Sequence, residues 1–165
     1  MPKPCAAGGF TLPEALLAAL LVGLLALLGL GSASRELALA RLESASRLVM
    51  LGLERGRDAA LRQGRSCALS LTAAGWQEPQ GSSLPACEGA ALALGEGLRE
   101  PGVTLSHNLP QAVRFTSNGL VIDGGTVLIS TEGAELVRCV VVALPLGVTR
   151  LGRHGPGGCL PEATR

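Results

Sequence analysis

The feature that most constrains this chain is an uncharged run of 20 residues, 15–34, that is rich in leucine and alanine. A helix rises about 1.5 Å per residue, so this run matches the roughly 30 Å hydrocarbon core of a bilayer. Glu14 stands immediately before the run and would lie in the first turn of such a helix, where the macrodipole favours a carboxylate. We therefore predict a transmembrane helix over residues 10–34, with one acid at its entrance.

The residues around this acid read Gly8-Gly9-Phe10-Thr11-Leu12-Pro13-Glu14 and resemble the class III signal of type IV prepilins and pseudopilins. The resemblance implies that a prepilin peptidase cuts after Gly9, that residues 1–9 are a leader peptide, and that Phe10 becomes the methylated N-terminus. It also implies that Glu14 neutralises the N-terminal amine of a neighbouring subunit during filament assembly. A buried carboxylate without such a partner would be strongly destabilising.

The alternative for the N-terminus is an ordinary secretory signal peptide, cleaved near the small residues 31–33. Glu14 inside the would-be signal and an apolar run longer than the usual roughly 7–15 residues both argue against it. Charges do not decide the orientation, because Lys3 on one side of the run faces several arginines on the other. A cytoplasmic N-terminus therefore follows from the resemblance alone.

Helical periodicity continues beyond the apolar run and predicts an amphipathic helix over residues 35–64 that ends near Gln63. Apolar residues recur at spacings of three, four or seven: Leu42, Ala45, Val49, Leu53 and Ala60. Two pairs at i,i+4 are expected to support it, Glu43 with Arg47 and Asp58 with Arg62. Gly52 and Gly56 are expected to weaken it, by about 1 kcal/mol each relative to alanine. A juxtamembrane stalk would show the same pattern.

Residues 65–165 are predicted to form a β-rich domain. Strands are expected at residues 67–71, 113–116, 120–122, 126–130, 135–143 and 148–151, and a Gly/Pro/Ser-rich loop at 77–102. Residues 117–119 and 123–125 are expected to be hairpin turns with positive φ. A long helix followed by an antiparallel meander is an α+β fold.

This second half is similar, in the order and spacing of its motifs, to the GspH/FimT-like minor pilins. The similar segments are 66–76, which ends in Gly75-Trp76, Arg-Phe-Thr-Ser-Asn-Gly at 114–119, the three valines at 140–142, and Gly-Val-Thr-Arg at 147–150. The resemblance implies a non-catalytic subunit of a type II secretion or type IV pilus filament. Such a subunit is a single-pass inner-membrane protein with a periplasmic or extracellular C-terminal domain. Its partners are other pilin or pseudopilin subunits and the inner-membrane assembly platform.

Some members of that family bind DNA during transformation through a Gly-Arg-x-Arg element near the C-terminus. Here the first arginine is absent, and Arg150, Arg153 and His154 are the candidate phosphate contacts. Without Lys3, 13 Lys+Arg balance 13 Asp+Glu, which excludes a uniformly basic nucleic-acid binder. Trp76 and Phe115 are the only aromatic residues after Phe10, so bases have few rings on which to stack. DNA binding stays open as the alternative function.

Four cysteines remain after the leader, which contains Cys5: Cys67, Cys87, Cys139 and Cys159. Their wide spacing, without a CxxC pair or a histidine at ligand distance, argues against a zinc site. Three disulfide pairings are open. We favour Cys67–Cys87 with Cys139–Cys159, because each closes a modest loop, and free buried thiols are the alternative. No nucleophile elbow, phosphate loop or metal-binding helix is present in the sequence, so we expect neither an enzyme nor a cofactor.

Overall fold

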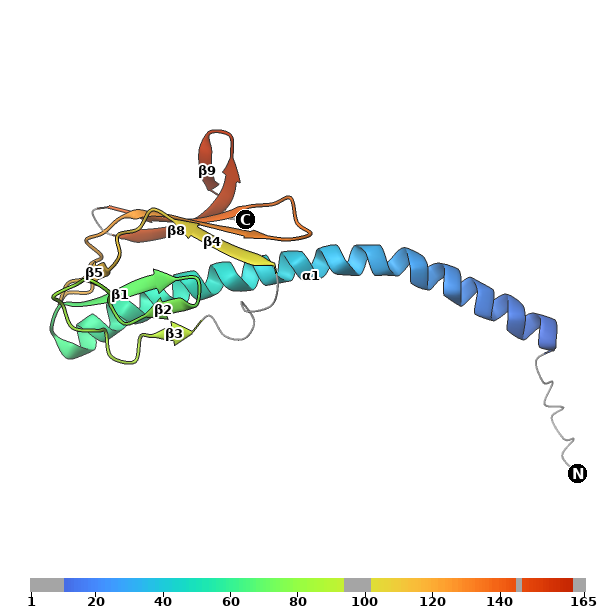
Figure 1. Cartoon of the computed structure of the whole chain (residues 1–165), viewed down its shortest axis with the longest axis horizontal. Coiled ribbons are helices and arrows are strands. Elements are labelled where there is room, and N and C mark those ends of the chain that lie inside the picture. The colour runs from blue at the N-terminus through green and yellow to red at the C-terminus, as the bar shows by residue number, and fades with distance from the viewer. Residues whose placement is uncertain (1–10, 94–101, 145–146, 162–165) are drawn as a thin grey trace, which may run out of the picture. The chain divides into compact units, whose positions relative to one another are not determined.

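The computed structural model describes residues 11–93, 102–144 and 147–161, apart from the side chains of residues 27–32 and 93. In these ranges the chain forms the helix α1 (Leu12–Gln63) and the strands β1 (Cys67–Thr72), β2 (Gly75–Gln77), β3 (Leu92–Ala93), β4 (Val103–His107), β5 (Val113–Phe115), β6 (Gly125–Thr131), β7 (Arg138–Ala143), β8 (Val148–Gly155) and β9 (Gly158–Pro161) (Figure 1). The fold is α+β, as predicted. The chain divides into two compact units, Met1–Glu36 and Leu37–Arg165.

In the first unit, α1 begins directly after Thr11. The Thr11 carbonyl accepts hydrogen bonds from the backbone N–H groups of Glu14 and Ala15, each at 3.0 Å. The Thr11 hydroxyl also lies 3.5 Å from a carboxylate oxygen of Glu14. Threonine before a helix and glutamate three residues later is the sequence pattern of a capping box, so Thr11 and Glu14 define where the helix starts.

The predicted transmembrane segment, residues 10–34, coincides with helical backbone from Leu12 onward. Residue 10 and the side chains of residues 27–32 lie outside the described part of the chain. Within the described part, no helix combines the length and the hydropathy needed to cross a bilayer.

In the second unit, the apolar stripe of α1 packs into the domain. Leu42, Ala45, Val49, Leu53 and Ala60 are each at most 1% exposed, which confirms the predicted buried face. The helix ends at Gln63, as predicted, and Gly64 follows in the left-handed region with φ 60°. The first i,i+4 pair also forms, with 3.1 Å between Arg47 Nε and Glu43 Oε1. The second, Asp58 with Arg62, is absent from the ion pairs of the described residues.

The strands form two sheets and not the single meander that we predicted. One sheet has the order β3-β2-β1-β5 and the other β4-β6-β7-β8-β9. Strand β5 leaves the meander because it pairs with β1, in the register Cys67 with Phe115. Both sheets contribute to one core with α1, and His107 on β4 bridges them through a 3.1 Å contact between Nε2 and the Leu71 carbonyl.

Several local predictions were wrong. Strands β4 and β9 were not expected, and β3 lies within residues 77–102, where we expected only loop. Residues 120–122 form no strand but a single bridge between Phe115 and Val121. Gly119 has the positive φ expected of a hairpin, at 73°, whereas residues 123–125 do not, and Gly125 already starts β6.

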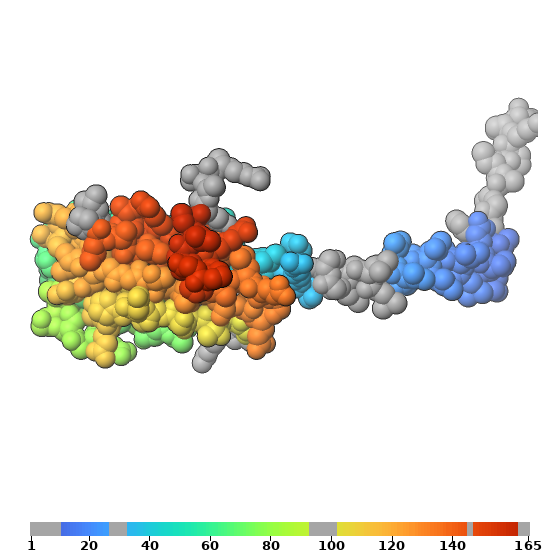
Figure 2. All heavy atoms as spheres, turned by 90° about the horizontal axis from the view of Figure 1, so that it is seen from above, coloured from blue at the N-terminus to red at the C-terminus, as the bar shows by residue number. Residues whose placement is uncertain are grey.

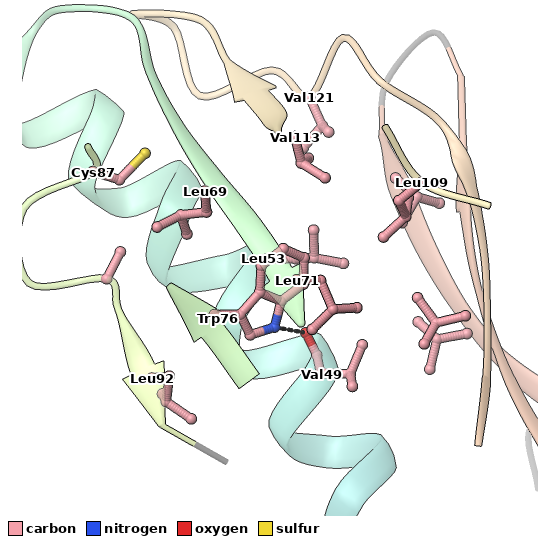
Figure 3. Packing of buried hydrophobic residues seen from close by; sticks show 14 of the residues in the cluster. Val49, Leu53, Leu69, Leu71, Trp76, Cys87, Leu92, Leu109, Val113 and Val121 are labelled. Atoms are coloured by element: carbon pink, nitrogen blue, oxygen red, sulfur yellow. Dashed lines mark hydrogen bonds between the residues drawn. The ribbon is translucent and has the colours of Figure 1, made fainter. Parts of the chain in front are cut away.

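In the buried half of α1, Gly52 and Gly56 each lie directly against an aromatic ring, and we call these two positions aromatic seats. A Cβ added to Gly52 would overlap Cδ1 of Trp76, and one added to Gly56 would lie 2.5 Å from Cζ of Phe115. The indole Nε1 of Trp76 donates a 3.1 Å hydrogen bond to the Val49 carbonyl (Figure 3). Glycine therefore lets these two rings approach the helix backbone, and its cost in helix propensity is offset by their burial.

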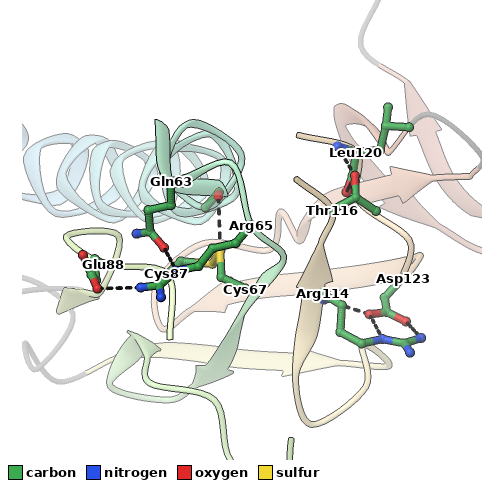
Figure 4. Close-up of a disulfide and its surroundings, with 10 residues drawn as sticks. Gln63, Arg65, Cys67, Cys87, Glu88, Arg114, Thr116, Leu120 and Asp123 are labelled. Carbon is green, nitrogen blue, oxygen red and sulfur yellow. Dashed lines mark hydrogen bonds and ion pairs between the residues drawn. A yellow bond between two sulfur atoms is a disulfide. The ribbon is translucent and has the colours of Figure 1, made fainter. Parts of the chain in front are cut away.

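A disulfide closes one end of the four-stranded sheet. Cys67 at the start of β1 is joined to Cys87, with 5.0 Å between the Cα atoms (Figure 4). Beside it, Arg65 donates to Gln63 at 3.2 Å and pairs with Glu88 at 2.8 Å. The segment after α1 is thus held to the loop that follows β2.

Candidate functional site

The predicted processing site lies largely outside the described residues. This applies to Gly9 and Phe10, whereas Glu14 is described and is exposed in the first turn of α1. Its contact within the described chain is the long one with the Thr11 hydroxyl. A carboxylate in this position remains accessible to a cation from another molecule.

The three residues predicted as a DNA-binding patch do not share one face of β8. Arg150 is opposite Val141 on β7, whereas Arg153 is opposite Arg138. Arg138 lies on the face that packs against α1, because its guanidinium is 3.1 Å from a carboxylate oxygen of Glu43. Side chains alternate between the two faces of a strand, so Arg150 and His154 lie on the outer face and Arg153 on the face toward α1. The three candidate phosphate contacts therefore do not form one continuous patch on β8.

The outer face of the five-stranded sheet is shaped by the second disulfide. Cys139 on β7 and Cys159 on β9 are linked, with 5.9 Å between their Cα atoms. Both pairings that the structure contains are those favoured from the sequence. Because β8 lies between these strands and Cys159 is out of register with Cys139, a flat sheet would separate the two Cα atoms by at least roughly 9.6 Å. The β8–β9 hairpin must therefore turn out of the plane of the sheet, on the side away from α1 (Figure 1).

Gly152 makes that turn feasible. A Cβ at this position would overlap the Leu160 carbonyl oxygen and would lie 3.0 Å from Sγ of Cys159. The hairpin is fixed on its other side as well, because the backbone N–H of His154 donates a 2.9 Å hydrogen bond to the Val137 carbonyl. Seen from above, the hairpin, in red, adjoins the yellow and orange strands of the same sheet (Figure 2).

Between the hairpin and the sheet lies a hollow of about 360 Å³. Its lining includes Ser106 from β4, Thr126 and Leu128 from β6, Asn108 between those strands, and His154 and Cys159 from the hairpin. Sequence reasoning found only the last two. The alternation of Val103 and Leu105 with Thr104 and Ser106 was the available indication that β4 presents hydroxyl groups on one face.

A second hollow, about 660 Å³, lies beside β5 and is bordered by an ion pair. Arg114 donates from Nε and Nη2 to the two carboxylate oxygens of Asp123, at 3.0 and 2.8 Å, and its backbone N–H donates to Asp123 at 2.8 Å (Figure 4). These hydrogen bonds from Arg114 lower the pKa of Asp123 below its usual value. Asp123 therefore anchors the segment after β5, where we had expected a turn residue.

Comparison with known proteins identifies the family. The family model described as type II transport protein GspH matches residues 36–145. The chain belongs to the GspH family. The match begins at the junction of the two units and runs through the buried half of α1 to the end of β7, so it includes both aromatic seats. Neither the curated proteins nor the solved structures gave a match to this GspH family member. The N-terminal motif around Glu14 and the β8–β9 hairpin lie outside the matched range.

Proposed function

We propose that this chain is a minor pseudopilin subunit of a type II secretion filament. It is anchored in the inner membrane by residues 10–34, after a prepilin peptidase has removed residues 1–9, and its second unit faces the periplasm. Membership of the GspH family and the class III signal motif support this proposal. Residues 1–10 are outside the described structure, so processing rests on the motif.

The observation that carries the proposal is the exposure of the first unit. Its described large aliphatic side chains are 54 to 75% exposed on all sides of the helix: Leu12, Leu16, Leu17, Leu20, Leu21, Val22, Leu24 and Leu25. Apolar surface of this extent is favourable only in contact with lipid or with apolar side chains of other molecules. A membrane anchor that later packs among the helices of a filament meets both conditions.

Glu14 is the polar group that would guide assembly. We propose that its exposed carboxylate pairs with the amine of Phe10 of a neighbouring subunit when the first unit leaves the membrane. In an apolar surrounding, either charge alone is costly, and the two together form a charge-assisted hydrogen bond. This pairing would select correctly positioned subunits.

Processing tests the proposal directly. Mass spectrometry of the chain from its native host should show a mature form that begins at methylated Phe10. Gly9→Val should abolish this form, because a bulky residue then precedes the cut, whereas Gly8→Val, the matched control, should be processed. A mature chain that begins near residue 34 would instead indicate an ordinary signal peptide.

DNA capture is the weaker proposal, because Arg153 lies on the opposite face of β8 from Arg150 and His154. A deletion strain distinguishes the two functions. In the strain that lacks this chain, we expect protein secretion to be lost and DNA uptake to remain intact. Loss of DNA uptake with intact protein secretion would instead favour a subunit for transformation.

A further inference from the structure

The hollow beneath the β8–β9 hairpin is preorganised. Asn108 continues the β4–β6 ladder beyond its last strand residue, since its backbone N–H donates to the Thr126 carbonyl at 3.2 Å. In return, the backbone N–H of Thr126 donates to Oδ1 of Asn108 at 2.6 Å. On the opposite side, the Cys139–Cys159 disulfide holds the hairpin in place. Both walls are thus fixed before any ligand arrives.

The same hydrogen bond fixes the chemistry of the Asn108 side chain. A backbone N–H can only donate, so the atom that faces Thr126 must be the amide oxygen. The amide nitrogen, with two N–H donors, is then directed away from Thr126. Asn108 is exposed and lines the hollow, so these donors are available to a ligand.

The remaining polar groups of the hollow are also able to donate. Ser106 and Thr126 contribute hydroxyl groups, and His154 contributes an exposed imidazole. His107 also borders the hollow, and its Nε2 is engaged with the Leu71 carbonyl. The register of the five strands places no carboxylate on the described outer face of this sheet. Arg150 is on that face, separated from Thr126 by Val141 of the intervening strand β7. Two strand spacings are about 10 Å, roughly one Debye length, so the charge of Arg150 favours an anion in the hollow.

We propose that this hollow binds a single oxyanion group, a phosphate or a carboxylate. Asn108 Nδ2 and the hydroxyl groups of Ser106 and Thr126 donate to its oxygens, His154 closes the site from the hairpin, and Arg150 adds a positive potential. The volume of about 360 Å³ suits one such group with a short attached chain. This site is independent of the filament role and of the first unit.

Nuclear magnetic resonance of the ¹⁵N-labelled full-length chain in a non-ionic detergent tests the site. Inorganic phosphate, added at constant ionic strength, should shift the Asn108 side-chain amide and the Thr126 backbone amide along a saturating curve. We expect a Kd of about 1 mM or weaker, in keeping with a few hydrogen bonds to one exposed ion. Shifts that do not saturate, or that sodium chloride reproduces, would overturn the proposal.

Asn108→Asp is the decisive variant. Its carboxylate can still accept the hydrogen bond from Thr126, so the ladder is kept, but the two N–H donors are replaced by a negative charge. Phosphate affinity should fall by at least about tenfold, because like charges then meet in the site. Asn118→Asp places the same charge in the hairpin after β5 and should change the affinity by less than about twofold. Equal affinity of the Asn108→Asp variant and the wild type would refute the site.

A second pair of probes identifies the source of the oxyanion. A peptide with four glutamates should shift the same two signals and compete with phosphate if the natural ligand is an acidic side chain, whereas a peptide with four glutamines should do neither. If phosphate binds and the glutamate peptide does not, the site takes a phosphate group. His154→Gln should weaken either ligand by about threefold, since it replaces a group that can carry charge with a neutral one.

Discussion

The two halves of α1 use their apolar residues in opposite ways. In the first unit the leucines whose side chains are described are exposed on every side, whereas in the second unit an apolar stripe from Ala38 to Ala60 is nearly or completely buried. The first half is the more hydrophobic by sequence, yet the core belongs to the second half. Glycine shows the same contrast, because Gly52 and Gly56 in the second half lie against two aromatic rings, whereas nothing lies within 4 Å of a Cβ added to Gly23 in the first half. Leucine content indicates an apolar environment, and a glycine in contact with a ring indicates where the chain supplies that environment itself.

The largest expected difference between the two halves is in the effect of replacing one leucine in each by alanine. Leu53 is fully buried, so Leu53→Ala should lower the free energy of unfolding of the domain by about 2–5 kcal/mol. Leu21 is 57% exposed, and Leu21→Ala should leave that free energy unchanged within about 0.5 kcal/mol. Urea unfolding followed by the fluorescence of Trp76, the one tryptophan of the chain, measures both. Similar losses in the two variants would show that the halves are not distinct.

Glycine replacement should give effects of opposite sign. In Gly52→Ala the new methyl group meets Trp76, and overpacking should cost about 1–3 kcal/mol. In Gly23→Ala nothing lies within 4 Å of the new Cβ, so helix propensity should stabilise the first unit by about 0.5–1 kcal/mol. The first variant is followed by Trp76 fluorescence, and the second by helical circular dichroism on heating. An increase in the free energy of unfolding in the Gly52→Ala variant would contradict the role of Gly52 as an aromatic seat.

The smallest effect on stability is expected when the acidic residues Glu43 and Glu14 are replaced by glutamine. Glu43 is 3.1 Å from both Arg47 and Arg138, and Glu43→Gln should cost the domain about 0.5 kcal/mol, because it neutralises one partner of two partly exposed ion pairs. Glu14→Gln should not change domain stability, because Glu14 belongs to the first unit and contacts Thr11 there. Its expected consequence is a loss of crosslinking to other filament subunits in cells. Normal crosslinking of the Glu14→Gln variant would show that this charge is not needed for assembly.

Local patterns were sufficient for the helix. The spacing of Leu42, Val49 and Leu53 identified the buried face, and Gly64 marked the end, because both depend on residues close in sequence. The role of Gly52 was not visible in that pattern. It depends on Trp76, which is brought to the helix only when β2 pairs with β1.

The sheets were harder to predict because their pairings are remote in sequence. Strand β5 pairs with β1 across more than 40 residues, while β4 and β6 enclose it in sequence and pair with each other. In a meander each strand pairs with the next one in the sequence. A predicted meander therefore does not contain the pairing of β1 with β5 or that of β4 with β6. The same limitation applies to the hollow: Asn108 and Thr126 showed no shared motif, and His154 was first grouped with Arg153, which the register places on the other face.

The turn of the β8–β9 hairpin at Gly152 also affects how copies of the chain can meet. A sheet normally ends in a strand whose free N–H and C=O groups can recruit another strand, which is a route to aggregation. Here β9 is the last strand of its sheet, and the disulfide to Cys139 draws it out of the plane and over the sheet's own face. The disulfide is thus a covalent guard against strand addition at that edge of the sheet.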